Sequence, residues 1–143
     1  VVRADDEALH AVLHTLGVDC VPNPEPERGI GYSIACAVNA TSRSDGWCLL
    51  PADMPCVMAS TTSQLADALR SGAALAAPFY QHRRGHPVAF SNRFVDALCA
   101  LDGDTGARNI LEQNAGQLAL IATDDGGVLV DIDTVLDLGQ NSE

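Results

Sequence analysis

The sequence predicts one α/β domain built on a mostly parallel β-sheet, with helices on both faces and an antiparallel edge. Short apolar runs typical of strands alternate with helical periodicities of about three turns for most of the chain. The last third adds hairpin-like strand pairs across turn sequences such as DDGG. With 143 residues, of which 47% are hydrophobic, the chain can bury an ordinary core and lacks the composition of a disordered protein. We therefore expect residues 1–143 to form a single domain.

The first half of the chain predicts strands and helices in alternation. Asp5 is the expected N-cap of a first helix, because apolar residues recur at helical spacing after it and Gly17 can end the helix in the left-handed conformation. The elements expected next are a strand at 18–21, a helix at 33–40 and a strand at 47–50. Since Val1-Val2 resembles the tail of a strand, we expect an N-terminal portion, with the first strand–helix unit, to be missing from this sequence.

The second half predicts a helix that begins at Thr61 or Thr62 and ends at Gly72. Strands are expected at ALAAP and PVAF, on either side of the turn-rich QHRRGH. Helices are expected at 91–101 and 107–114, and LALIAT and VLVDID should then pair as strands across DDGG.

The charge balance is strongly acidic, since eight Arg and no Lys oppose nineteen Asp and Glu, for a formal net charge of −11. Such a surface repels a phosphate backbone, so we expect no nucleic-acid partner, although one phosphate-bearing small molecule could bind through local positive charge or a divalent cation. The apolar runs are short and no signal-peptide pattern opens the chain, so no membrane partner is expected. The five cysteines are odd in number and lack C-x-x-C spacing, which favours reduced thiols in the cytoplasm over a zinc site.

A carboxylate on a stiff loop is the first candidate ligand. Asp53 lies in LLPADMPCV, shortly after the strand-like WCLL, and Pro51 and Pro55 restrict the backbone on either side. Ligands of an open parallel sheet collect beyond the carboxyl ends of its strands, so this position suits a prepositioned metal ligand. The alternative is that Asp53 caps a turn before the helix at Thr61.

Asp131 and Asp133 form a second candidate pair, at the end of the last expected strand. Strand alternation would put both side chains on one face, where two like charges repel unless a cation or an arginine lies between them. The alternative is a strand end exposed to solvent, with Asp133 or Thr134 capping a last short helix.

The densest positive cluster of the chain is HRRGHP, in which Arg83, Arg84 and His86 surround Gly85. Arginine provides planar donors for phosphate or carboxylate, and glycine lets a ligand approach the backbone closely. A solvated hairpin turn with ordinary charges is the alternative.

Two further segments precede expected helices. In GDTGAR, the helix N-terminus near Arg108 could receive an anion, or Asp104 or Thr105 could simply cap the helix. ERGIGYS offers two glycines, but the full dinucleotide-binding and P-loop patterns are absent from the sequence.

Taken in order, LLPADMP, APFY, RRGHPVAF, LDGDTGAR and VLVDIDT resemble the molybdenum cofactor nucleotidyltransferase family over roughly residues 18–138. LLPADMP is shared by several nucleotidyltransferases, whereas RGHPV with GDTGAR and DIDT is more specific, and GDTGAR favours the cytidylyltransferase branch. The resemblance implies a three-layer α/β/α Rossmann-like fold and Mg²⁺-dependent transfer of CMP from CTP to molybdopterin, with release of pyrophosphate. The alternatives are GTP as the nucleotide, a noncatalytic protein that hands molybdopterin to a molybdenum hydroxylase, or a sugar-nucleotide enzyme on the same scaffold.

The resemblance also implies roles for individual residues. The metal-binding set, of which the first two members are also catalytic, is Asp53, Asp131 and Asp133. The nucleotide-binding set is Asn23, Gly31, Ser33 and Asp53. The set that contacts the pterin phosphate or the rest of the acceptor substrate is Arg84, Gly85, His86 and Arg108.

One departure from the family concerns its glycine-rich loop, which follows the first strand and is followed by a lysine. That loop is absent here, and the sequence contains no lysine. We therefore expect weak or absent nucleotide transfer by the chain as written. Loss of a central strand would also expose sheet edges, which favours dimers or aggregation.

Overall fold

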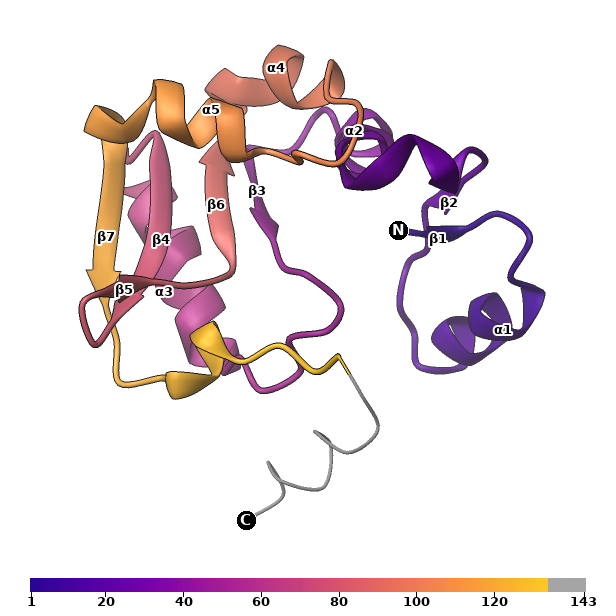
Figure 1. The fold of residues 1–143 in the computed structure, drawn as a ribbon, viewed down its shortest axis with the longest axis horizontal. Helices are drawn as coiled ribbons and strands as arrows, with labels where there is room; N and C mark the ends of the chain where they lie inside the picture. The colour runs from indigo at the N-terminus through magenta and orange to yellow at the C-terminus, as the bar shows by residue number, and fades with distance from the viewer. Residues whose placement is uncertain (134–143) are drawn as a thin grey trace. The chain divides into compact units, whose positions relative to one another are not determined.

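The computed structural model describes residues 1–133, which are drawn in colour in Figure 1. These residues form two compact units of helices and strands. The first unit is formed by Val1–Ser44 and Arg93–Asn114. Within the described residues, the second is formed by Asp45–Asn92 and residues 115–133. Each unit is thus assembled from segments that are far apart in the sequence.

The first unit combines a small parallel sheet with several helices. Strand β1 (Val2–Arg3) pairs with β2 (Pro22–Asn23), and Val2 lies opposite Pro22. The helical elements are α1 (Glu7–Thr15), η1 (Pro26–Arg28), α2 (Gly29–Ala40), α4 (Val95–Cys99) and α5 (Arg108–Gln113), with η2 (Asn92–Phe94) at the boundary of the unit.

Local sequence accounts for the limits of α1, with one shift. The side chain of Asp6, rather than the expected Asp5, caps the helix by accepting a hydrogen bond from the N–H of Leu9 at 3.0 Å. Gly17 has the expected left-handed conformation, with φ 70°. The expected strand at 18–21 is displaced to β2, and α2 begins earlier than expected, at Gly29.

The second unit is built on a five-stranded sheet (Figure 1). Its strands are β3 (Gly46–Leu49), β4 (Leu75–Tyr80), β5 (Arg83–Arg84), β6 (Val88–Ser91) and β7 (Leu118–Ala122). The order is β3-β6-β4-β5, and β7 pairs with β4. The helix α3 (Ala59–Arg70) connects β3 to β4 and is followed by Gly72 with φ 101°, as expected for a closing glycine.

The expectation of a mostly parallel sheet is wrong. Within the five-stranded sheet, β4 and β7 pair in parallel, whereas β6 is antiparallel to both β3 and β4, and β5 is antiparallel to β4. The reason is the length of the connection between β4 and β6, which consists of residues 81–87. A parallel crossover needs about a dozen residues or more, so β6 must return in the opposite direction.

The hydrophobic core of the second unit lies where α3 packs on the sheet. Leu65 of α3, Ala76 of β4 and Ala89 of β6 are fully buried and form one cluster. Small residues on the strands let the helix approach closely, and Leu65 fills the space between helix and sheet. The neighbours that complete the cluster are Cys48, Ala68, Leu69, Ala119 and Ile121.

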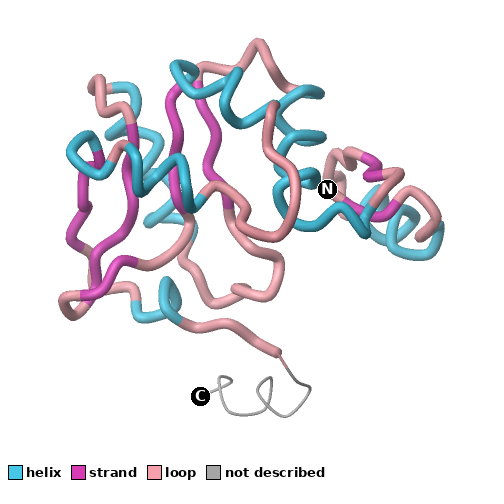
Figure 2. The backbone as a smooth tube through the Cα atoms, turned by 45° about the horizontal axis from the view of Figure 1, so that its top comes forward, coloured by secondary structure: helices cyan, strands magenta, loops and turns pink. Residues whose placement is uncertain are grey.

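The expected strand VLVDID does not form. After β7 the chain continues as a loop and the 3₁₀ helix η4 (Gly126–Leu129), and residues 130–133 are irregular (Figure 2). DDGG is therefore not a hairpin turn, because the side chain of Asp125 caps η4 by accepting a hydrogen bond from the N–H of Gly127 at 2.9 Å. The expected helix cap at Thr134 lies outside the described residues.

Within residues 1–133, no helix combines the length and the apolar character that a membrane crossing requires.

Candidate functional site

Three loops leave the same edge of the sheet in the second unit. Strands β3 and β4 are both antiparallel to β6, and β7 is parallel to β4, so the carboxyl ends of β3, β4 and β7 meet at one edge. We name the three connections the Asp53 loop (residues 50–58), the arginine turn (residues 81–87) and the C-terminal strap (residues 123–133). Loops at such an edge are the usual location of a ligand site in α/β folds.

The Asp53 loop and the C-terminal strap run antiparallel to each other. The N–H of Ile132 donates to the carbonyl oxygen of Asp53 at 2.8 Å, and the N–H of Met58 donates to the side chain of Asp125 at 2.8 Å. Between these two contacts, Gly127 lies against Cys56 so closely that a Cβ atom on Gly127 would overlap the Cys56 carbonyl group. Backbone contacts therefore join the two segments along their length.

This pairing determines where the three candidate metal ligands lie. Asp53 is exposed, and Asp131 and Asp133 are exposed on either side of the half-buried Ile132. The hydrogen bond of Ile132 to Asp53 thus brings the DID segment next to the DMP segment, although Asp131 and Asp133 are not in a strand. Their roles as metal ligands remain predictions, and residues 1–133 contain no group of three or more His, Cys, Asp or Glu side chains placed to hold a metal ion.

The arginine turn is a hairpin. Arg83 and Arg84 form β5, pair with Tyr80 and Phe79 of β4 and are exposed to solvent. Gln81 has φ 45° and His82 has φ 63°, which is the left-handed backbone that such a tight reversal requires.

Gly85 is a point of close approach between two backbones. Its N–H donates to the carbonyl oxygen of Pro78 at 3.0 Å, and a Cβ atom here would overlap the carbonyl oxygen of Val128. The next residue, His86, donates its N–H to that same carbonyl of Val128 at 2.9 Å. The sequence predicted a glycine that gives a ligand room, whereas in the structure Val128 of the C-terminal strap occupies the space over Gly85.

The imidazole of His86 lies between opposite charges. It is half-buried, and its Nδ1 is buried with no hydrogen-bond partner among residues 1–133. Burial lowers the pKa of His86 first, and the positive charge of Arg84 lowers it further, whereas the carboxylate of Asp53 and a hydrogen bond to the Leu49 backbone act in the opposite direction. His86 is therefore neutral near pH 7. It interacts electrostatically with Arg84 in its own turn and with Asp53 in the Asp53 loop.

The predicted nucleotide-binding residues Asn23 and Ser33 lie together in the first unit. The Nδ2 of Asn23 donates to the Ser33 hydroxyl at 3.0 Å, and its Oδ1 accepts from the N–H of Glu25 at 2.9 Å. Asn23 is only 2% exposed, so these bonds satisfy a buried amide. The N–H of Gly31, the third predicted member, donates to the carbonyl oxygen of Gly103 at 2.8 Å.

The segment LDGDTGAR packs on the start of α2. Arg28 forms a bidentate ion pair with Asp102: its Nε donates to Oδ1 at 3.2 Å and its Nη2 donates to Oδ2 at 3.0 Å. The guanidinium of Arg28 lowers the pKa of the Asp102 carboxyl, and hydrogen bonding to Asp102 raises the pKa of Arg28. A Cβ atom on Gly31 would lie 2.7 Å from the Asp102 carbonyl oxygen, so the second glycine of ERGIG serves this packing.

The helix that carries Arg108 lacks the expected cap. Helix α5 begins at Arg108, and its N-cap is Ala107, which provides no side-chain hydrogen bond. The expectation that Asp104 or Thr105 caps this helix is therefore wrong, because the N–H of Arg108 pairs with the backbone carbonyl of Thr105 instead. The assignment of Arg108 to substrate binding remains a prediction.

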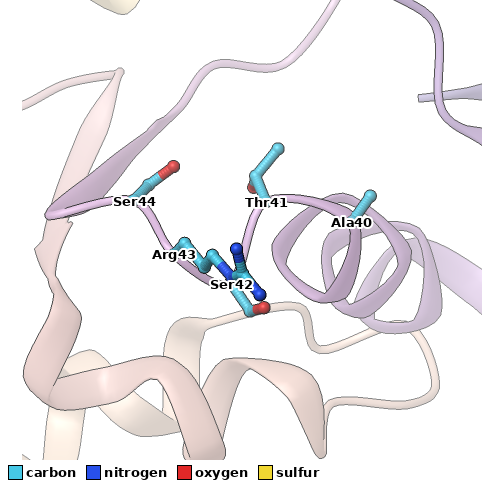
Figure 3. Close-up of a pocket in the computed structure, with 5 residues that line it drawn as sticks. All are labelled: Ala40, Thr41, Ser42, Arg43 and Ser44. Atoms are coloured by element: carbon cyan, nitrogen blue, oxygen red, sulfur yellow. The ribbon is translucent and has the colours of Figure 1, made fainter.

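A hollow of about 380 Å³ lies at the C-terminal end of α2 (Figure 3). Its lining consists of Ala40, Thr41, Ser42, Arg43 and Ser44. Arg43 is the charged member of this lining, but the carbonyl end of a helix disfavours an anion. The hollow contains none of the predicted site residues, so it does not coincide with the candidate site.

Sequence reasoning missed Asp125 and misread Thr61. Asp125 is 2% exposed and accepts from the hydroxyl of Thr61 at 2.6 Å. Thr61 is buried within α3 rather than at its N-cap, which is Met58. The only signal in the sequence was the doubled aspartate of DDGG, which was read as a turn.

An exposed DMP loop, a paired DID segment and an arginine-rich turn thus lie at one sheet edge, and these are the motifs that resemble a nucleotidyltransferase family. The chain belongs to the family of the MobA-like NTP transferase domain, whose profile matches residues 1–118. It is therefore an enzyme of nucleotidyl transfer, with a nucleoside triphosphate as substrate.

Three solved structures to which the chain is similar come from mycobacteria. Rv0371c from Mycobacterium tuberculosis is 26% identical, with a TM-score of 0.77, and the match covers 94% of this chain and 70% of that one. Its homologue from Mycobacterium sp. strain JC1 is 26% identical, with a TM-score of 0.73, over 94% and 69% of the two chains. Rv0371c in complex with manganese is 25% identical, with a TM-score of 0.74, over 94% and 73%. No curated protein matches the chain.

Proposed function

We propose that this chain is the nucleotidyltransferase domain of an enzyme that transfers CMP from CTP to molybdopterin, with Mg²⁺ as its cofactor. The observation that carries the proposal is the 2.8 Å hydrogen bond from the N–H of Ile132 to the carbonyl of Asp53. Because an exposed aspartate flanks Ile132 on each side, this bond places two further carboxylates next to the Asp53 loop. The molybdenum-specific part rests on the motifs RGHPV, GDTGAR and DIDT. In the reaction, a phosphate oxygen of molybdopterin forms a bond to the α-phosphorus of CTP, the α–β phosphoanhydride bond breaks, and pyrophosphate leaves.

The donor set fits a hard divalent cation. Carboxylate oxygens are the ligands that Mg²⁺ and Mn²⁺ prefer, and the exposed Asp53, Asp131 and Asp133 supply only such oxygens. Mg²⁺ is commonly held by one or two protein carboxylates together with substrate phosphate oxygens and water, and these aspartates could supply the protein share. The structure of Rv0371c in complex with manganese is a precedent in a similar chain.

The side chains of the site would divide the work between charge and position. When bound, Mg²⁺ neutralises the phosphate charge that develops as pyrophosphate leaves. Asp53 would hold the cation from the stiff Asp53 loop, and Arg84 would offer guanidinium donors to the acceptor phosphate. His86 is neutral, so it can hydrogen-bond to a substrate without adding charge. An ionised phosphate nucleophile needs no general base.

The test measures the release of pyrophosphate from CTP and from GTP by the full-length gene product, in the presence of Mg²⁺ and molybdopterin. We expect release that requires CTP and molybdopterin, and a loss of about 100-fold or more in Asp53→Ala, because removal of a metal ligand costs several kcal/mol of transition-state stabilisation. Asp124→Ala is the matched control, since Asp124 is an exposed aspartate of the C-terminal strap that is not a predicted ligand.

Each other outcome has a definite meaning. Turnover of Asp53→Ala at the rate of the unmodified protein would refute the metal role. Preference for GTP would assign the guanylyltransferase branch. Molybdopterin binding without pyrophosphate release would indicate a carrier protein, and turnover of a sugar phosphate alone would indicate a sugar-nucleotide enzyme.

A further inference from the structure

Asp125 is a buried carboxylate to which the proposed reaction assigns no role. It is 2% exposed, and both of its oxygens are hydrogen-bonded. Oδ2 accepts from the N–H of Met58 at 2.8 Å and from the hydroxyl of Thr61 at 2.6 Å, and Oδ1 accepts from the N–H of Gly127 at 2.9 Å. A buried carboxylate without such donors would be strongly unfavourable, so these bonds are a condition for its presence in the interior.

The partners of Asp125 belong to two different segments. Met58 and Thr61 are at the end of the Asp53 loop and the start of α3, whereas Gly127 is in the C-terminal strap. Asp125 therefore fixes one end of the antiparallel pairing whose other end is the bond of Ile132 to Asp53. Between these ends the two backbones are in contact at Gly127 and Cys56.

Apolar packing alone does not orient the Asp53 loop. Met54 is 5% exposed and anchors the loop against the interior. Packing of a flexible methionine is nondirectional, so it limits the distance of the loop from the core without fixing the direction of the Asp53 backbone. The directional constraints are the hydrogen bonds of Asp125 and Ile132.

We propose that Asp125 is the positioning residue of the metal site: it clamps the Asp53 loop to the C-terminal strap and so holds Asp53 beside Asp131 and Asp133. This inference rests on the proposed function of Asp53 as a metal ligand. Groups that orient metal ligands affect affinity because the cation needs its oxygens at fixed places, and their loss typically weakens binding by about 10- to 100-fold.

The experiment compares Asp125→Asn with Asp124→Asn in the full chain. The first change keeps the shape of the buried side chain but sets an amide group against donors, whereas the second alters an exposed neighbour. Two quantities are measured: the affinity for Mn²⁺ together with CTP, by calorimetry, and the hydrogen exchange of the backbone amides of Ala52, Asp53 and Met54. For Asp125→Asn we expect affinity about 10-fold weaker and exchange about 10-fold faster, with no change for Asp124→Asn.

A milder variant keeps the test decisive if Asp125→Asn does not fold. In Thr61→Val, valine has nearly the shape of threonine but lacks the hydroxyl that donates to Asp125. The N–H donors of Met58 and Gly127 are unchanged. We expect it to shift both quantities in the same direction by a smaller factor.

The outcomes separate this inference from the proposed function. If folded Asp125→Asn or Thr61→Val leaves either the exchange of the amides of residues 52–54 or the affinity unchanged, Asp125 does not position the site. If the unmodified protein does not bind Mn²⁺ with CTP, or Asp53→Ala binds it equally well, the metal role of Asp53 fails. In that case the positioning role fails with it, and faster exchange in Asp125→Asn would assign a purely structural clamp.

Discussion

The replacement of Gly85 by alanine tests the packing of the arginine turn against the C-terminal strap. An ideal Cβ atom on Gly85 would overlap the Val128 carbonyl oxygen and lie 2.7 Å from the Val128 Cβ and Cγ2 atoms. Native Cβ atoms do not approach other atoms this closely, and a backbone carbonyl cannot rotate away as a side chain can. The two segments would have to separate.

The cost of that separation has two parts. Overpacking of a close-packed site typically costs about 1–3 kcal/mol. Separation also weakens the hydrogen bonds of Gly85 N–H to Pro78 at 3.0 Å and of His86 N–H to Val128 at 2.9 Å, and each such bond contributes about 1 kcal/mol net. We therefore expect Gly85→Ala to lower the free energy of unfolding by about 3 kcal/mol, a large share of the stability of an ordinary domain.

Urea unfolding followed by tryptophan fluorescence measures this loss. Trp47 is the single tryptophan of the chain and lies in β3, opposite Phe90 of β6, so it reports on the unit that contains Gly85. Gly116→Ala is the matched control, because a Cβ atom there has nothing within 4 Å, and it should change stability by no more than about 0.5 kcal/mol.

A double variant sharpens the result. Val128→Ala should not rescue Gly85→Ala, because the carbonyl oxygen of residue 128 remains in place. If Gly85→Ala is as stable as the control, or if Val128→Ala restores its stability, the Val128 carbonyl does not limit which residue fits at position 85.

Two further predictions concern the core and the effect of pH. Leu65→Ala removes the fully buried side chain between α3 and the sheet and should cost about 2–5 kcal/mol in the same urea assay, whereas a cost below about 1 kcal/mol would contradict the assignment of the core. Because burial lowers the pKa of His86, the unfolded chain binds a proton at this position more readily than the folded chain does. Stability should therefore fall as pH decreases from about 7.5 to about 5.5, and His86→Gln should lessen that fall, whereas identical pH profiles for the two proteins would refute the shift.

The helices and strands of the second unit were largely predictable because their signals are local. ALAAP and PVAF are strands, LALIAT is a strand, and the helix before Gly72 ends as its left-handed glycine requires. The antiparallel direction of β6 was not predicted, although the short connection of residues 81–87 contains that information. Alternation of helices and strands is typical of parallel sheets, but the length of a single connection decides the direction of the strand that follows it.

The candidate site was predicted in part. The sequence indicated that the DMP and DID segments would lie near one sheet edge, and the bond of Ile132 to Asp53 joins them. The expected strand for VLVDID was wrong, because Asp125 turns the chain into η4. Residue types alone could not reveal this, since an aspartate in DDGG is equally compatible with an exposed turn and with a buried clamp.

The sequence by itself determined most helices and strands of the second unit and the conformations of Gly17 and Gly72, because periodicity and backbone freedom act between near neighbours in the chain. Only the tertiary structure decided that Gly85 and Gly127 adjoin protein backbone and that Asp125 is buried. These properties depend on contacts between segments far apart in the sequence, and no local pattern encodes which segment will fill the space beside a glycine or supply donors to a carboxylate.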